Sequence, residues 1–210
     1  MATAGRFATL TRAADDGRCA PAGTTVAAQA SVMQNHIESA IAKVAGLTAA
    51  VDARFKGLRG VFTTLAKQHH EVDALLTGAQ ATTDFVKRAE LWRQIRVELI
   101  SHEQAEHLEI YPVLEAYEAT QGIARTHTAH SAELERLIGF LDETNVQSTH
   151  WQPILVQLIA KFHEHVQLEE QEFFARAQAF LGDAAAKALV QPFLRAKELA
   201  KRELEAGARA

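Results

Sequence analysis

Apolar residues recur every three or four positions through four successive segments of this chain, beginning at residue 58. This spacing is typical of helices that bury one face, whereas the period-two alternation of strands is almost absent. Turn-forming residues separate the four segments. The pattern therefore predicts an all-α protein whose main domain, residues 58–180, is an up-down-up-down four-helix bundle.

Three further segments flank the predicted bundle. Residues 1–25 are small and polar without periodicity, so we expect a flexible leader. Residues 26–57 carry a weaker helical pattern, and residues 183–208 predict a C-terminal helix that is interrupted at Pro192 and has a mainly structural role.

The ends of the four bundle helices are predicted from glycine, proline and capping residues. We expect the first helix to end before a glycine, the second to break at a proline, and the third to begin after a glycine. Short polar side chains are candidates for capping the second and fourth helices. These boundary residues are Gly78, then Thr82, Thr83 or Asp84, then Pro112, Gly122, and finally Ser148 or Thr149.

Two copies of one short motif lie on the second and fourth apolar stripes. Each is a histidine followed four residues later by a glutamate, His102 with Glu106 and His165 with Glu169. Residues i and i+4 lie on one face of a helix, one turn apart, so each motif presents an imidazole beside a carboxylate. This arrangement is typical of metal ligands.

The first and third stripes contribute histidines without a paired glutamate. His69 and His130 lie in phase with their stripes, at intervals of ~30 residues that suit one helix and a short turn. A displacement of one residue rotates a side chain by about 100°, so His69 is preferred to His70 and His165 to His163. The same argument leaves Glu103 and His107 at the edge of the core.

Burying this many ionisable side chains without a partner would cost several kcal/mol each. A single histidine on an apolar stripe is usually a core residue, but a set of six requires a common partner, and a metal centre supplies one. His127 shares the third stripe and remains open as a seventh ligand, a donor to a bound molecule, or a histidine at the end of the bundle. The predicted metal ligands are His69, His102, Glu106, His130, His165 and Glu169.

The ligand types narrow the choice of metal. Imidazoles and carboxylates without thiolate favour iron, with manganese as the alternative, over a structural zinc site. Four histidines and two glutamates exceed the needs of one ion. Two ions about 3.5–4 Å apart can each take two histidines and share both glutamates, leaving room for an oxo or hydroxo bridge and a small ligand.

Composition excludes several other classes of function. The net charge is −4, the pI is about 6.2, and no block of lysine and arginine indicates nucleic acid or an anionic membrane as a partner. Cys19 is the single cysteine, which excludes an internal disulfide framework and fits a reducing compartment. No apolar stretch approaches the roughly 20 residues of a membrane span. These features predict a cytoplasmic protein.

The motifs together resemble those of the hemerythrin-like, HHE cation-binding family of four-helix bundles. The resemblance implies a non-haem di-iron bundle that binds dioxygen, nitric oxide or peroxide, or that handles iron itself. It covers a little over half of the chain. It is carried by residues 65–76 around His69, His102-x3-Glu106 followed by Tyr111-Pro112, residues 130–137 from His130, and His165-x3-Glu169 followed by Phe173-Phe174.

The chain departs from the oxygen-carrying members of that family, which have His-x3-His on the third helix and His-x4-Asp on the fourth. Here the third helix has His127-x2-His130 and the fourth has His165-x3-Glu169. The fourth-helix pattern is more similar to the iron–sulfur cluster repair branch, the RIC or ScdA-like di-iron proteins. That branch usually carries paired cysteines in an N-terminal module, whereas this chain has Cys19 alone.

Three hypotheses for function follow, and they leave open whether the protein is an enzyme. The first is binding or sensing of a small diatomic ligand, O2 or NO, or of peroxide. The second is iron–sulfur cluster repair or reduction of NO or peroxide, which requires an external electron donor. The third is a helical scaffold with an incidental metal. The oligomeric state is open.

Overall fold

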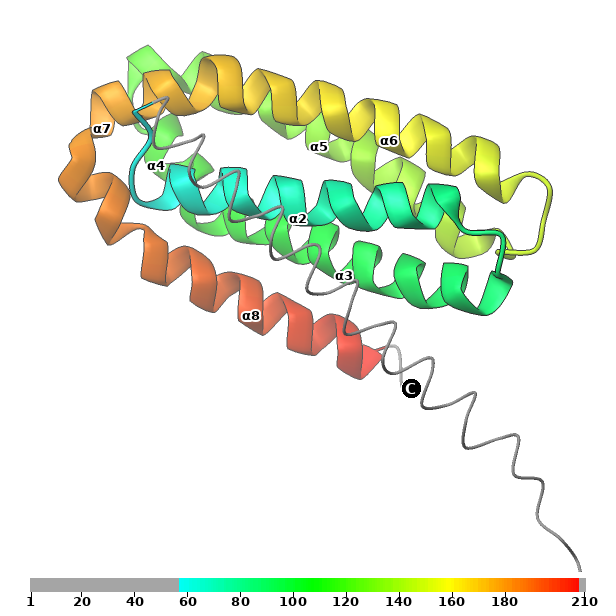
Figure 1. Cartoon of the computed structure of the whole chain (residues 1–210). Coiled ribbons are helices and arrows are strands. Elements are labelled where there is room, and N and C mark those ends of the chain that lie inside the picture. The colour runs from blue at the N-terminus through cyan, green and yellow to red at the C-terminus, as the bar shows by residue number, and fades with distance from the viewer. Residues whose placement is uncertain (1–56, 208–210) are drawn as a thin grey trace, which may run out of the picture. The chain divides into compact units, whose positions relative to one another are not determined.

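The structure is a computed structural model that describes residues 57–207. Four long helices form the bundle, α2 (Val61–Ala81), α3 (Phe85–Glu109), α5 (Glu118–Glu143) and α6 (Trp151–Leu168). Figure 1 shows them running alternately up and down, with the α2–α3 and α5–α6 turns at the same end. All regular elements of the described residues are helical, which confirms the predicted fold class. The predicted leader and N-terminal helical segment lie outside the described residues, apart from Gly57.

The chain continues beyond the bundle through shorter elements. The short helix α4 (Tyr111–Glu115) links α3 to α5, and a π-helical turn, η1 (Glu169–Phe173), joins α6 directly to α7 (Phe174–Ala188). The last helix, α8 (Val190–Gly207), packs along α3 on the outside of the bundle (Figure 1). The backbone of α7 is non-helical at Gly182 (φ 78°, ψ 164°), so its last segment begins at Asp183, where the C-terminal helix was expected to start. The interruption expected at Pro192 falls at Leu189, and Pro192 lies in the first turn of α8, where a missing N–H costs no helical hydrogen bond.

Two of the predicted helix boundaries are confirmed by the structure. Asp84 is the N-cap of α3, and its carboxylate accepts hydrogen bonds from the backbone N–H groups of Val86 (2.8 Å) and Lys87 (3.3 Å). The break expected at Pro112 occurs at Ile110, immediately before the proline begins α4.

Three other boundaries differ from the prediction. Helix α2 continues through Gly78, which faces Leu91 of α3, and ends three residues further on at Ala81. Helix α5 begins at Glu118, so Gly122 lies inside it. His150 is the N-cap residue of α6, and Ser148 instead accepts a hydrogen bond from the backbone of His150 at 3.2 Å.

Gly60 determines how α2 begins. Its φ of 58° lies in the left-handed region, and a side chain there would overlap the backbone carbonyl of Ala186 in α7. The start of α2 and the end of α7 are thereby held in close contact. No helix of the described residues is both long and apolar enough to cross a membrane.

Candidate metal centre

The ionisable side chains of the bundle lie between two separate apolar clusters. On each bundle helix the buried histidine is flanked on one side by one cluster and on the other side by the second. The first cluster lies toward α4 and α7 and includes Phe62, Leu65, Ala105, Tyr111, Ala124, Phe173 and Phe174. The second lies toward the other end and includes Val72, Leu99, Leu134, Trp151, Leu158 and Phe162. A polar layer thus crosses the bundle at one level.

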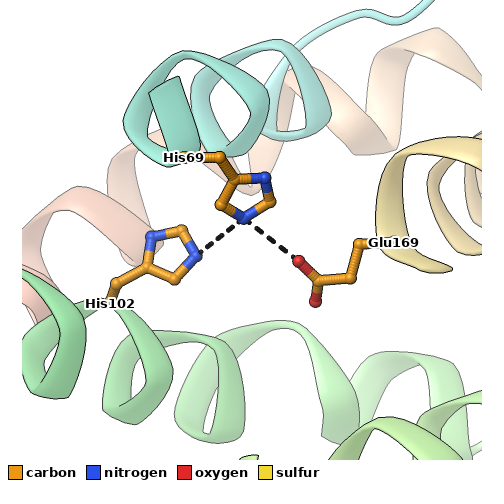
Figure 2. Close-up of side chains that lie close together, drawn as sticks. All are labelled: His69, His102 and Glu169. Atoms are coloured by element: carbon orange, nitrogen blue, oxygen red, sulfur yellow. Dashed lines mark hydrogen bonds and ion pairs between the residues drawn. The ribbon is translucent and has the colours of Figure 1, made fainter. Parts of the chain in front are cut away.

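Three residues from three different elements form the first ligand group. The Nε2 atom of His69, on α2, lies 3.2 Å from Nε2 of His102, on α3, and 3.1 Å from Oε2 of Glu169, on η1 (Figure 2). All three side chains are 0–3% exposed. Two imidazole nitrogens bound to one metal at about 2.1 Å and at right angles would lie about 3.0 Å apart, so this spacing suits a shared cation.

A second group lies on the other side of Glu169. The Oε1 atom of this glutamate is 3.5 Å from Nδ1 of His127, on α5, and 3.5 Å from Nε2 of His165, on α6. Glu103 extends the group, since its Oε1 lies 3.2 Å from Nε2 of His165. Glu169 therefore directs one oxygen toward each pair of histidines.

Glu106 and Tyr111 complete the centre beside the first group. The Oε2 atom of Glu106 lies 3.6 Å from Nε2 of His102. The buried hydroxyl of Tyr111 lies 3.4 Å from this same oxygen and 3.4 Å from Oε1 of Glu169. A phenol that can donate to either carboxylate places a proton source next to both of them.

Several buried atoms of the centre make no hydrogen bond with any described residue. Three of these atoms lie 3.1–3.5 Å from another ionisable atom, as ion-pair contacts only. Buried polar atoms are nearly always satisfied, so a concentration of unsatisfied carboxylate oxygens and ring nitrogens is what a metal site would leave in the protein alone. The set fits a metal well. The atoms are Glu103 Oε2, Glu106 Oε1, Glu169 Oε2, His127 Nδ1 and both ring nitrogens of His165.

The protonation of the centre shows how strongly its charges interact. Burial alone would lower the pKa of His165, but the charges of Glu169 and Glu103 outweigh it and raise that pKa to about 9. Burial opposes ionisation of Glu169, yet His165 and His69 bring its pKa down to about 2. Burial, with Glu169 and Glu103 nearby, raises the pKa of Glu106 well above its usual range. Protons therefore occupy positions that a metal cation would take.

The π turn at the end of α6 positions two successive glutamates on one imidazole. Glu169 approaches Nε2 of His69, and the Oε1 atom of Glu170 lies 3.1 Å from Nδ1 of the same ring. A π turn is wider than an α turn and is often found at functional sites. Glu170 is therefore half-buried against a candidate ligand.

Five of the predicted ligands are brought together by the fold, namely His69, His102, Glu106, His165 and Glu169. His127 joins them, with 3% of its surface exposed. His130 does not lie in any of the ligand groups of the described residues. It is half-buried, and its ring centroid is 6.4 Å from that of His127.

Helix α3 carries one buried candidate ligand that the periodicity missed. Glu103 is 2% exposed and lies in a potential ligand group with His102 and Glu106, which corrects its predicted position at the edge of the core. Glu103 follows Leu99, an apolar core position, by four residues, and this spacing could have indicated that Glu103 is buried. His70 and His163 are exposed, as the phase argument predicts.

Comparison with known families decides the class of protein. The family model of the hemerythrin HHE cation-binding domain matches residues 60–177, which is more than half of the chain. The chain belongs to this family. The matched region of this hemerythrin domain spans α2 to the first turn of α7 and contains every residue of the ligand groups. Comparisons with curated proteins and with solved structures find no match.

The hemerythrin assignment and the geometry agree on cation binding. The family description names a cation, and the buried His/Glu groups offer nitrogen and oxygen donors without thiolate.

Proposed function

We propose that this hemerythrin domain holds two non-haem iron ions and binds a small ligand, O2, NO or peroxide, at that centre. The observation that carries the proposal is the position of Glu169 between two histidine pairs. It is a member both of the group with His69 and His102 and of the group with His127 and His165. One carboxylate with one oxygen toward each pair is the arrangement of a bridge between two ions.

The donor set supports iron over zinc, with manganese as the alternative. Two imidazoles and a shared carboxylate would hold each ion, and such nitrogen and oxygen donors without thiolate suit iron and manganese. When bound, iron supplies reversible electron transfer to a diatomic ligand. Glu106 and Glu103 are the further carboxylates available, one beside His102 and the other beside His165.

Burial determines which ligands the centre accepts. The side chains that hold it are 0–3% exposed, and the two apolar clusters close the bundle on either side. A layer so enclosed admits a diatomic molecule or peroxide rather than a large substrate. The Tyr111 hydroxyl, which reaches Glu106 and Glu169, is placed to donate a hydrogen bond to such a ligand.

A surface hollow between α3 and α5 lies next to the residues of the centre. It is lined by Gln104 and Thr128, which directly follow the buried Glu103 and His127. His107 also lines this hollow, and its ring is 4.9 Å from that of Tyr111. This hollow is the proposed entry route for a small ligand.

A catalytic role is the second candidate, favoured by the His165-x3-Glu169 pattern that resembles the iron–sulfur cluster repair branch. In that role the same centre would reduce NO or peroxide, or release iron for repair, with electrons from an external donor. The glutamate at residue 169 is the specific feature that supports it.

The two roles differ in turnover. For the binding role we expect the anaerobically reduced protein to form a stable spectroscopic adduct with O2 or NO, and to consume neither when a reductase is added. Sustained, reductase-dependent consumption of NO or peroxide would support the catalytic role instead. Absence of any spectral change with all three ligands would contradict both roles.

A further inference from the structure

Helix α8 lies outside the matched hemerythrin region, yet two of its side chains lie beside the candidate ligand His102 or one residue away from it. Phe193 packs edge-on against the His102 ring, with centroids 5.8 Å apart. One turn later, the side chain of Lys197 is only 5% exposed, whereas lysines usually lie at the surface. A buried lysine is costly unless it is paired and hydrogen-bonded, so its contacts point to a role.

The buried lysine reaches the candidate ligand His102 through one intermediate residue. Its Nζ atom donates to Oε1 of Gln68 at 2.6 Å, and the same oxygen lies 3.0 Å from Nδ1 of His102. When Nε2 of His102 binds a metal, Nδ1 carries the proton and donates to Gln68. Lysine and histidine then share one acceptor.

The charges around Lys197 leave a net positive charge at this position. Glu98 pairs with Lys197 at 3.1 Å and with Lys201 at 2.5 Å, so two lysines face one carboxylate. The other nearby carboxylate, Glu71, is itself paired with Lys67 at 3.4 Å. Glu98 therefore neutralises only part of the combined charge of the two ammonium groups, one of which lies close to the centre.

The two imidazoles of the first group consequently have different partners. Nδ1 of His69 faces the carboxylate of Glu170, whereas Nδ1 of His102 faces an amide oxygen that Lys197 already occupies. A carboxylate partner makes a ligating imidazole more basic, and an acceptor shared with a cation makes it less so.

We propose that Lys197 is a positioning residue of the metal centre, which orients Gln68 toward His102 and raises the reduction potential of the bound iron. The inference rests on the proposed function, because it requires a redox-active metal. It makes α8 an electrostatic part of the centre, in addition to its packing on α3.

The test compares midpoint potentials of the iron-loaded full-length protein and its variants by spectroelectrochemical titration. Lys197→Met removes the charge and keeps an apolar side chain of similar length. Lys201→Met is the matched control, because it removes the same charge from the same helix and from the same Glu98 pair, but does not reach Gln68. Gln68→Met removes the shared acceptor and leaves Lys197 in place.

We expect Lys197→Met to shift the equilibrium between reduced and oxidised iron at least tenfold toward the oxidised state. For a one-electron couple this is a fall in midpoint potential of about 59 mV. Lys201→Met should shift the potential by less than half as much. Gln68→Met should shift it in the opposite direction, since His102 loses its acceptor while the ammonium remains. This variant also provides the test if Lys197→Met does not fold.

Equal shifts for Lys197→Met and Lys201→Met, or no shift for Gln68→Met, would overturn the inference. Failure of the proposed function is a separate result, because the unsubstituted protein would then bind no iron or show no redox-linked spectral change. Two irons per chain with unmoved potentials would refute the role of Lys197 alone.

Discussion

The Nε2 atoms of His69 and His102 face each other at 3.2 Å, although the two residues come from different helices (Figure 2). Their Nδ1 atoms point away, toward Glu170 and Gln68 respectively. Each ring is thus oriented by a hydrogen-bonding partner at Nδ1, and the two Nε2 atoms are directed at a common point. This is how a protein orients imidazoles for a metal before the metal arrives.

Substitution of Glu169 is expected to have the largest effect on metal content. Glu169→Ala removes the carboxylate common to both ligand groups, so we expect fewer than one iron per chain, against two in the unsubstituted protein. Metal analysis after iron-replete expression measures this loss. The midpoint of thermal unfolding should also fall, because a metal at a thousandfold excess over its Kd stabilises the fold by about 4 kcal/mol.

Glu172 provides the control for this substitution. It lies on the same π turn but is exposed, so Glu172→Ala should keep both irons. Retention of two irons by Glu169→Ala would contradict the bridging role.

The third bundle helix offers a choice between two histidines. His127 is buried at the centre and His130 is only half-buried, so we expect His127→Ala to lose at least one iron and His130→Ala to retain both. Metal analysis of the two variants side by side distinguishes them. The reverse result would restore the ligand set expected from periodicity.

The Tyr111 hydroxyl is expected to act on the bound ligand rather than on metal binding. Tyr111→Phe keeps the ring packed against Phe173 and should retain both irons. Loss of one hydrogen bond worth about 1 kcal/mol should speed dissociation of the small ligand by about fivefold. Stopped-flow measurement of ligand release tests this, and an unchanged rate would show that the hydroxyl does not contact the ligand.

The pH dependence of stability should differ between the metal-free and metal-loaded protein. His165 has a pKa raised from 6.5 to about 9, so its contribution is complete below pH 6.5 and is lost as the pH rises to 9. His69 and Glu106, whose pKa values are also raised, act in the same direction. Between pH 6.5 and 9 the metal-free protein should therefore lose a few kcal/mol.

Urea unfolding at several pH values measures this dependence. Metal ligands bind in their deprotonated form, so the metal-loaded protein should not lose stability over the same range. A metal-free protein that is equally stable at pH 6.5 and pH 9 would contradict the proton positions described for the centre.

Much of the fold could be predicted because its signals are local. The Asp84 cap, the break before Pro112 and the buried His-x3-Glu pairs each depend on a few neighbouring residues. The position of the third-helix histidine was harder to predict. The side chains of His127 and His130 point only about 60° apart around the helix, and apolar residues of the same helix lie on both sides. The apolar pattern therefore does not distinguish the two histidines.

The side chains that were missed depend on tertiary packing. Helix α3 contacts α2, α5 and α8, so its buried face is wider than a stripe predicted from four helices, and Glu103 falls within it. The π turn at 169–173 breaks the 3.6-residue period and brings Glu170 inward. Lys197 lies on a helix expected to be structural, and its contact with Gln68 joins residues 129 positions apart.

The number of iron ions bound per chain is the most direct test of the proposed di-iron centre. It is measured on protein expressed with excess iron, together with the absorption spectrum of the reduced protein before and after O2 or NO. A di-iron centre that binds a small ligand gives two irons per chain and a new absorption band on ligand addition. Fewer than one metal per chain, with no spectral change, would contradict it.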